Sequence, residues 1–205
     1  MGMPVQKRGC SIAEYLKLEG DSDERHEYHD GEILAMAGGS PEQSFIIVNF
    51  VGEVGNALKG TKYRVAGSNL RVRIPHPPRY AYPDASIICG PVQIDPQDPQ
   101  RHSILNPKVI VEVLSTSTEA YDRGEKFTQY RQIESFEEYI LISQDRPNFE
   151  SFLRQPDGAW SIQTCTGLQS SAKIRSLGIE IPMTEIYAGI EWPAPVEGAG
   201  AEAAG

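Results

Sequence analysis

The sequence predicts an α/β protein, an α+β fold with a mixed sheet, formed by a single domain over residues 1–190. Segments with apolar residues at helical spacing are separated and followed by segments with the period-two alternation of strands. At 205 residues the chain is long enough for one domain to bury well over half of its unfolded surface. Its 40% hydrophobic and 23% charged residues are typical of globular proteins and exclude collagen-like, coiled-coil and wholly disordered chains.

Three segments are predicted to be helices, and each carries start signals; before the third, Thr116 with Glu119, or Ser115 with Thr118, offers capping groups. Ser11 is a suitable N-cap, with Glu14 three residues later as its capping-box partner. Pro41 stands at a first helical position, where proline is favourable, and opens an apolar run that we expect to form a buried helix. The predicted helices cover residues 11–18, 41–60 and about 118–133.

Strands are predicted where apolar residues alternate, or where β-branched residues cluster between turn-forming residues. Three of them follow one another between residues 62 and 89, which predicts a meander. Turn-forming stretches separate the strands of the C-terminal third, so we expect an antiparallel arrangement there. The predicted strands lie within residues 31–39, 62–65, 69–74, 82–89, 108–114, 138–143, 148–154, 159–165 and, with one helical turn, 179–187.

The remaining segments are predicted to lack regular structure. Residues 90–107 are rich in Pro, Asp and Gln and favour a loop. Residues 191–205 are small, polar and proline-bearing, and we expect them to form a disordered tail. No segment approaches the ~20 consecutive apolar residues of a membrane span, and none has the apolar core of a signal peptide. We therefore expect a cytoplasmic location and no membrane partner.

Cysteine and histidine patterns exclude several kinds of site. Cys10, Cys89 and Cys165 are odd in number and far apart, so we expect reduced thiols, without a disulfide framework or a structural zinc site. His26 and His29 stand beside an Asp-Gly turn and are interpreted as solvated side chains instead of a metal pair. The motifs of P-loop, α/β-hydrolase and zincin enzymes do not occur.

The net charge of -9 bears on the kind of partner. Sequence-independent affinity for nucleic acid comes from Lys and Arg, so the acidic balance counts against a nuclease. It does not exclude one, because carboxylates that hold a divalent cation add to the formal negative charge, although the bound cation neutralises them in the working protein.

Glu112 lies in the apolar run 108–114, which has the pattern of a central strand buried on both faces. Burying an unpaired carboxylate is costly, so Glu112 must be protonated, paired, hydrogen-bonded or part of a site that requires it. Two interpretations remain open: an ion pair with an arginine such as Arg71 or Arg73, or a ligand in a functional site.

Asp84 follows Pro83, which cannot donate to a sheet ladder, so its carboxylate is expected near the end of a sheet. Taken alone, Pro-Asp is typical of an ordinary turn. Together with Glu112 on an adjacent strand and a backbone carbonyl, it gives the all-oxygen ligand set that suits Mg²⁺. Such an ion stabilises charge on a phosphate and activates a bound water, which are the tasks of phosphodiester cleavage.

Lys126 falls about two turns into the third predicted helix, on the same edge as Tyr130 and Ile133. Its ammonium can therefore reach over the sheet, orient a water and offset phosphate charge. The alternative is an i, i+4 ion pair with Asp122 on an exposed helix. Gly124 in mid-helix costs about 1 kcal/mol relative to alanine, which indicates the close approach of another group and favours a site.

Four segments carry a family resemblance: DGEILAMAGG, YPDASIICG, NPKVIVEVLSTSTEAYDRGEKFTQYRQI and EYILISQDRP. Together they resemble the Uma-two family of putative restriction endonucleases, which is common in cyanobacteria and is assigned to the PD-(D/E)xK nuclease superfamily. The resemblance extends from about residue 11 to residue 190. It implies a restriction-endonuclease-like αβ core with extra antiparallel strands.

The resemblance also implies roles for individual residues. Asp84 and Glu112 would be metal ligands, assisted by the carbonyl of Val113. The superfamily usually places its lysine two residues after the second acid, where this chain has Leu114. Lys126, in the Asp-x-x-x-Lys segment of the family, is the implied replacement.

The resemblance and the residues together predict a Mg²⁺-dependent endodeoxyribonuclease, with Mn²⁺ as an alternative ion and DNA as the substrate. We expect a homodimer, because two related sites cut both strands of a duplex most easily. The alternative is a catalytically inactive interaction or scaffold domain with the same fold. Two departures from the family keep it open: relatives often have a histidine in place of Gln43 and an acid in place of Asn69.

Overall fold

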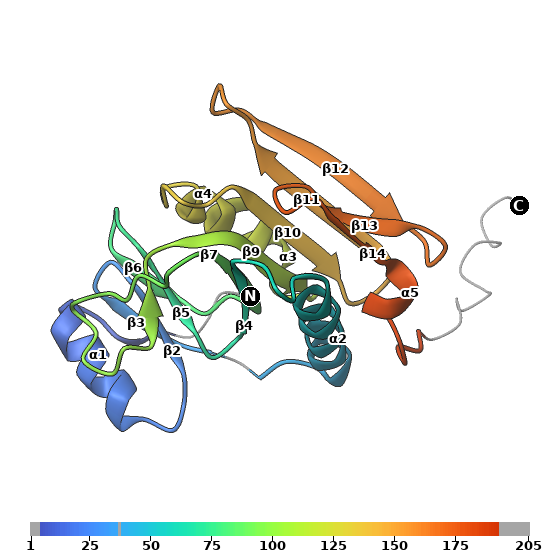
Figure 1. Ribbon diagram of the computed structural model, residues 1–205. Helices are drawn as coiled ribbons and strands as arrows, with labels where there is room; N and C mark the ends of the chain where they lie inside the picture. Colours follow the sequence, from blue (N-terminus) through green and yellow to red (C-terminus); the bar gives the residue numbers. More distant parts are fainter. Residues whose placement is uncertain (1–4, 37, 193–205) are drawn as a thin grey trace, which may run out of the picture.

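The computed structural model describes residues 5–36 and 38–192 (Figure 1). They form a mixed α/β fold with two six-stranded sheets and a two-stranded ribbon, which confirms the predicted fold class. Residues 193–205 of the predicted tail lie outside the described residues. Trp192, which the prediction placed in the tail, packs against Tyr187 and donates a hydrogen bond to the backbone oxygen of Gln144.

The main sheet contains the predicted central strand. This strand, β9 (Pro107–Leu114), runs antiparallel to β7 and parallel to β10, and all of its residues except Lys108 are buried. The C-terminal strands pair antiparallel, as predicted. The order across the main sheet is β12 (Trp160–Thr166), β11 (Asn148–Arg154), β10 (Glu138–Ser143), β9, β7 (Ala85–Cys89) and β4 (Tyr63–Gly67).

The side sheet corrects the predicted meander. β4 pairs with β7, while the two strands between them, β5 and β6, pair with each other in the side sheet. Alternation along a segment identifies a strand but not its partner, and these pairings are set by long-range packing. The side-sheet order is β1 (Val5–Lys7), β3 (Glu32–Ala35), β2 (His26–His29), β6 (Arg79–Ala81), β5 (Arg71–Ile74) and β8 (Ser103–Ile104). The ribbon is β13 (Ser171–Ile174) and β14 (Ile179–Pro182).

The first two predicted helices begin where expected. The capping box is present: Ser11 accepts from the N–H of Glu14, whose carboxylate accepts from the N–H of Ser11 at 2.8 Å. The third predicted helix is divided, with a π-helical turn at its centre. The helices are α1 (Ile12–Asp21), α2 (Pro41–Ala57), α3 (Glu119–Tyr121), the π-helix η1 (Asp122–Lys126), α4 (Phe127–Tyr130) and α5 (Met183–Ile186). Among the described residues, no helix is long and apolar enough to cross a membrane.

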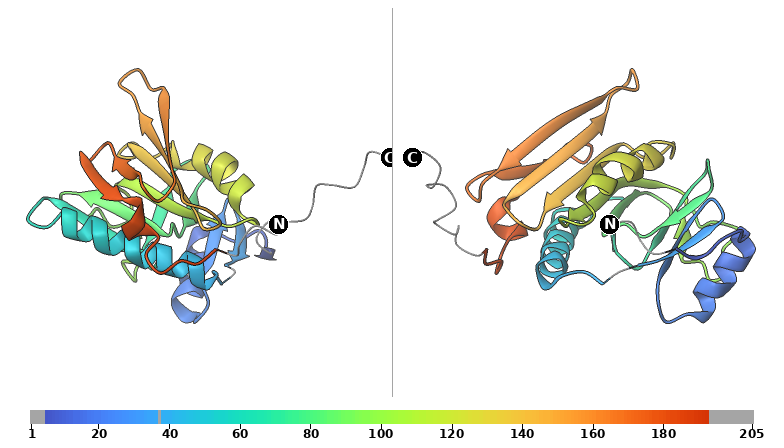
Figure 2. Two further views of the ribbon diagram at one scale, coloured as in Figure 1. Left: turned by 90° about the vertical axis from the view of Figure 1, so that its right-hand side faces the viewer. Right: turned by 180° about the vertical axis from the view of Figure 1, so that it is seen from behind.

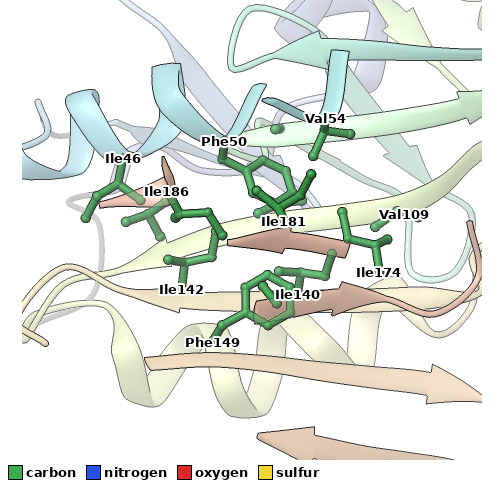
Figure 3. Packing of buried hydrophobic residues seen from close by; sticks show 14 of the residues in the cluster. Ile46, Phe50, Val54, Val109, Ile140, Ile142, Phe149, Ile174, Ile181 and Ile186 are labelled. Atoms are coloured by element: carbon green, nitrogen blue, oxygen red, sulfur yellow. The ribbon is translucent and has the colours of Figure 1, made fainter. Parts of the chain in front are cut away.

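Two hydrophobic clusters cover the two faces of the main sheet. On one face, α2, the ribbon and α5 pack against β9 and β10, and Figure 3 shows Phe50 and Val54 of α2 among isoleucines of β10 and the ribbon. On the other face lie the aromatic side chains of α4, including Tyr130. Figure 2 shows α3, η1 and α4 on the face opposite α2. The central strand β9 is thus held from both sides.

Phe50 provides a test of this packing, because it is 1% exposed at the centre of the α2 cluster. We expect Phe50→Ala to lower the free energy of unfolding by about 3–5 kcal/mol, through lost burial and the cavity left behind. Phe45, on the same helix but 55% exposed, is a matched control, and Phe45→Ala should change it by less than about 0.5 kcal/mol. Urea denaturation measures both, and equal losses would contradict the assigned packing.

Candidate active site

Asp84 lies directly before β7, with its carboxylate beside the neighbouring strand β9. Its Oδ2 accepts a hydrogen bond from the backbone N–H of Val113 at 2.6 Å. The contact agrees with the strand register, in which Ala85 is paired with Val111. Asp84 is therefore fixed against the strand that carries Glu112.

The carbonyl oxygen of Val113 lies beside Asp84, and both contact the side chain of Gln43. The Nε2 of Gln43 donates to Asp84 Oδ2 and to Val113 O, each at 3.3 Å. Gln43 stands in the first turn of α2, which begins with Ser40 as N-cap. Its amide occupies space left by Gly39, because a Cβ at that residue would lie 2.4 Å from Gln43 Oε1. Two oxygens predicted as metal ligands thus converge on one donor.

Glu112 is 3% exposed, and its carboxylate meets two side chains from the helical segment that follows β9. Its Oε1 lies 2.8 Å from Nζ of Lys126 and accepts a hydrogen bond of 2.9 Å from the hydroxyl of Tyr130. The interpretation of an ion pair with Arg71 or Arg73 is wrong, because both arginines pair with aspartates that follow β7 in the chain.

The π-helix η1 places Asp122 beside Lys126. The Nζ of Lys126 lies 3.5 Å from Asp122 Oδ1, so the i, i+4 ion pair considered for Lys126 is present, together with its contact to Glu112. Both residues are buried and not on an exposed helix, with Asp122 4% and Lys126 8% exposed. Outside its own helix no protein atom lies within 4 Å of the Cβ position of Gly124, so no other part of the described chain makes the close approach expected there. A π-turn, a feature frequent at functional sites, distinguishes this segment.

Glu27 and Asp122 are the carboxylates that the sequence analysis missed as site residues. Glu27 is 1% exposed and comes from β2 of the side sheet. Its Oε1 accepts from the backbone N–H of Tyr82 at 3.0 Å, and its Oε2 lies 3.1 Å from Nε2 of His29. Asp122 was considered only as an exposed ion-pair partner.

His26 and His29 are not solvated, which corrects that interpretation. His26 is 3% exposed, and its Nδ1 lies 3.0 Å from Glu19 Oε2. The side chain of His29 is 11% exposed and lies beside Glu27. Three residues apart on one strand, the two histidines point to opposite faces of the sheet and do not form a metal pair.

Burial and the charges of the carboxylates around Lys126 together shift the pKa values of the site. Burial raises the pKa of Glu112 well above its ordinary value, and burial also raises the pKa values of Asp84 and Asp122. Burial alone would lower the pKa of Lys126, but the surrounding carboxylates, Glu112 first among them, raise it well above its ordinary value. Lys126 therefore stays protonated at neutral pH, while the carboxylates share an excess of negative charge.

The oxygens of the site fit a hard divalent cation. In the part of the chain that the structure describes, no three or more His, Cys, Asp or Glu side chains are grouped as metal ligands. A cation would therefore be held by the smaller set predicted: the carboxylates of Asp84 and Glu112 and the carbonyl of Val113. Mg²⁺ is commonly bound by one or two carboxylates and keeps several waters. The convergence of Asp84 and Val113 O on one donor is consistent with such a set.

A protein-family model and two related sequences match the chain. The family model, Uma2, is described as "Putative restriction endonuclease" and matches residues 12–184. Two uncharacterized proteins of Synechocystis sp. are similar to the chain. One, slr1290, is 35% identical over 181 residues, which cover 88% of this chain and 92% of the relative. The other, sll1609, is 31% identical over 157 residues, which cover 77% and 88%.

A solved structure shares the fold. It is the crystal structure of a "putative nuclease belonging to DUF820" from Anabaena variabilis, and it matches with a TM-score of 0.68 over 87% of this chain and 97% of that chain. The sequence identity is 15%, so the likeness is one of fold. This likeness is consistent with the restriction-endonuclease-like fold that the resemblance implied.

Lys126→Met tests the charge balance of the site. At pH 8 we expect the free energy of unfolding to fall by about 3–5 kcal/mol, because the variant leaves buried carboxylates uncompensated. Carboxylates whose pKa is raised on folding become protonated in the native state at a higher pH than in the unfolded state, and a neutral carboxyl group needs no positive partner. The loss of unfolding free energy should therefore shrink as the pH falls toward 5.

The matched control is Lys173→Met, because Lys173 and Glu180 form a pair at 3.8 Å in which both side chains are 53% exposed. Its effect should stay below about 1 kcal/mol at either pH. Urea denaturation at pH 8 and pH 5 provides the comparison. A loss for Lys126→Met that does not depend on pH would be evidence against the charge balance described.

Proposed function

The chain belongs to the Uma2 family of putative restriction endonucleases, and from this premise we propose that it is a Mg²⁺-dependent endodeoxyribonuclease that hydrolyses phosphodiester bonds. One observation carries the proposal: Asp84, Glu112 and Lys126, from separate parts of the chain, are linked through β9, where Asp84 contacts the Val113 N–H and Lys126 contacts Glu112. Fold likeness alone is an argument by analogy, whereas these side chains supply chemistry.

In this proposal Asp84 and Glu112, with the carbonyl of Val113, hold the Mg²⁺ ion, and Mn²⁺ suits the same oxygens. When bound, the ion offsets charge on the phosphate and lowers the pKa of a bound water. The protein contributes fixed ligands, because the Val113 N–H holds Asp84 and the Tyr130 hydroxyl holds Glu112.

Lys126 acts as a fixed cation and not as a base, because its raised pKa keeps the ammonium protonated. Its contact with Glu112 at 2.8 Å holds Nζ in place. From there its N–H groups orient the attacking water and offset negative charge that develops on the phosphate. The position two residues after Glu112, where the superfamily usually has its lysine, is occupied by Leu114. This side chain is uncharged and buried in the aromatic cluster, with 3% of it exposed, so Lys126 supplies the charge instead.

DNA is the proposed substrate, since the family is described by a restriction activity. With a net charge of -9 the protein depends on local cations and on the bound ion for phosphate contacts. A homodimer and a cytoplasmic location, both expected from the sequence, stay predictions.

A second function is favoured by one observation, the contact of Gln43 with Asp84 and Val113 O. The amide of Gln43 donates hydrogen bonds to these oxygens, so they have a partner even without a metal ion. A non-catalytic interaction or scaffold domain would require such a partner. Calorimetric titration with Mg²⁺ separates the two functions. We expect the wild type to bind the ion and Asp84→Asn to lose that binding, whereas a scaffold takes up no ion through its carboxylates.

Glu112→Ala is the sharpest test of activity. With supercoiled and linear DNA in Mg²⁺ or Mn²⁺, we expect the cutting rate to fall by a factor of about 10² or more, since a group fixed at the reacting centre is lost. Glu138→Gln is the matched control: Glu138 is also fully buried and accepts backbone N–H groups, but of Arg175 and Ser176. It should cut at the wild-type rate.

Two results would overturn the proposal. One is a wild-type protein that cuts no form of DNA with either ion. The other is a Glu112→Ala protein that cuts as fast as the wild type, which would also point to a contaminating nuclease.

A further inference from the structure

Glu27 is a buried carboxylate that the proposed mechanism does not use. It is 1% exposed and comes from β2 of the side sheet, whereas the other acids lie directly before β7, on β9 and in η1. We propose that Glu27 is a positioning residue for the metal site: its carboxylate holds Asp84 in place through the backbone of Tyr82. The inference rests on the proposed function, because it concerns the same metal site.

Glu27 contacts the chain just before Asp84. Glu27 Oε1 accepts from the backbone N–H of Tyr82 at 3.0 Å. Tyr82 and Pro83 lie between β6 and β7, outside both strands, so this N–H has no ladder partner and the carboxylate supplies one. The hydroxyl of Tyr82 is held separately by Glu19 at 2.7 Å. Tyr82 is thus anchored at its backbone and at the end of its side chain.

The backbone between Tyr82 and Asp84 is short and stiff. Only Pro83 separates Tyr82 from Asp84, and the ring of a proline fixes its φ angle. The proline also restricts the backbone of Tyr82 before it. Fixing the Tyr82 N–H therefore also restricts the position of Asp84, the residue proposed to hold the ion.

The carboxylate of Glu27 is itself held in place by neighbouring side chains. Arg79 Nη1 lies 3.2 Å from Nδ1 of His29, and since arginine only donates, Nδ1 must accept. A neutral His29 then carries its hydrogen on Nε2, which donates to Glu27 Oε2 at 3.1 Å. Glu27 is therefore bridged between two donors, one from β2 and one from the segment before β7.

The electrostatics agree with this geometry. Burial would raise the pKa of Glu27, but the charge of Lys126 and the donors at His29 and Tyr82 outweigh it and lower the pKa below its ordinary value. Glu27 is thus an ionised acceptor, in contrast to Glu112, whose pKa burial raises. A group that orients a metal ligand typically changes metal affinity by about 10- to 100-fold when it is altered.

Two substitutions in the full-length protein separate the position of the oxygen from its charge. Glu27→Gln keeps an oxygen for the Tyr82 N–H but loses the charge and the acceptor for His29 Nε2, while Glu27→Asp keeps the charge and withdraws both oxygens by about 1.5 Å, one C–C bond. The probe is Mn²⁺ alone, titrated calorimetrically without DNA. We expect Glu27→Asp to bind Mn²⁺ about 10-fold more weakly than the wild type and Glu27→Gln to stay within about 3-fold.

Glu138→Gln serves as the control for altering a buried carboxylate, and its Mn²⁺ affinity should equal that of the wild type. Circular dichroism checks that each variant is folded. The comparison of Mn²⁺ affinity between Glu27→Gln and Glu27→Asp does not require either variant to keep the full stability of the wild type. The Tyr82 amide gives a second readout, because its hydrogen exchange should be faster in Glu27→Asp than in the wild type.

The outcomes separate this inference from the proposed function. Wild-type binding of Mn²⁺ with unchanged affinity in Glu27→Asp overturns the positioning role and leaves the nuclease proposal standing. A larger loss in Glu27→Gln than in Glu27→Asp also overturns it, because the charge or the His29 contact would then matter more than the contact with the Tyr82 backbone. A wild type that binds no Mn²⁺ through Asp84 overturns both.

Discussion

The structure of the site depends on one electrostatic constraint: several acids share one ammonium group in a place with little water. Glu27, Glu112 and Asp122 are buried around or near Lys126, and Asp84 stands at the edge of the same group. Like charges this close disfavour full ionisation, so the fold must supply donors, protons or a cation. Each acid has donors of its own, from the Val113 and Tyr82 backbones or from side chains.

The π-helix η1 helps to satisfy this electrostatic constraint by positioning Lys126. Lys126 must meet both Glu112 on β9 and Asp122 on its own helical segment, and it does so at 2.8 and 3.5 Å. A π-turn changes the angle at which successive residues leave the helix axis. One turn later, Tyr130 reaches the same oxygen of Glu112 and lies in the aromatic cluster. The packing of that face and the charge arrangement are thus settled by the same few residues.

The sequence predicts those parts of the site whose surroundings are local. Glu112 stands out because its own strand is apolar, and Asp84 because a proline precedes it. Glu27 could not be found in the same way, since its burial comes from packing of the side sheet against the segment before β7. One signal was present: Glu27 and His29 alternate with His26 and Tyr28 before an Asp-Gly turn, the pattern of a hairpin. The strand partners β4–β7 and β5–β6 depend on long-range contacts, which local alternation does not encode.

The free energy that it costs to bury this charged cluster bears on which function the protein has. A buried group of ions is often no more stable than apolar side chains of similar volume, so stability alone does not require Lys126 and its acids. A scaffold could fill the space between β9 and α4 with more of the aromatic packing that already lies there. An ion-binding site needs oxygen ligands at Asp84 and Glu112, and it needs a fixed cation that keeps the site from repelling a phosphate. The excess negative charge, which is a burden to the fold without metal, is what a divalent cation would neutralise.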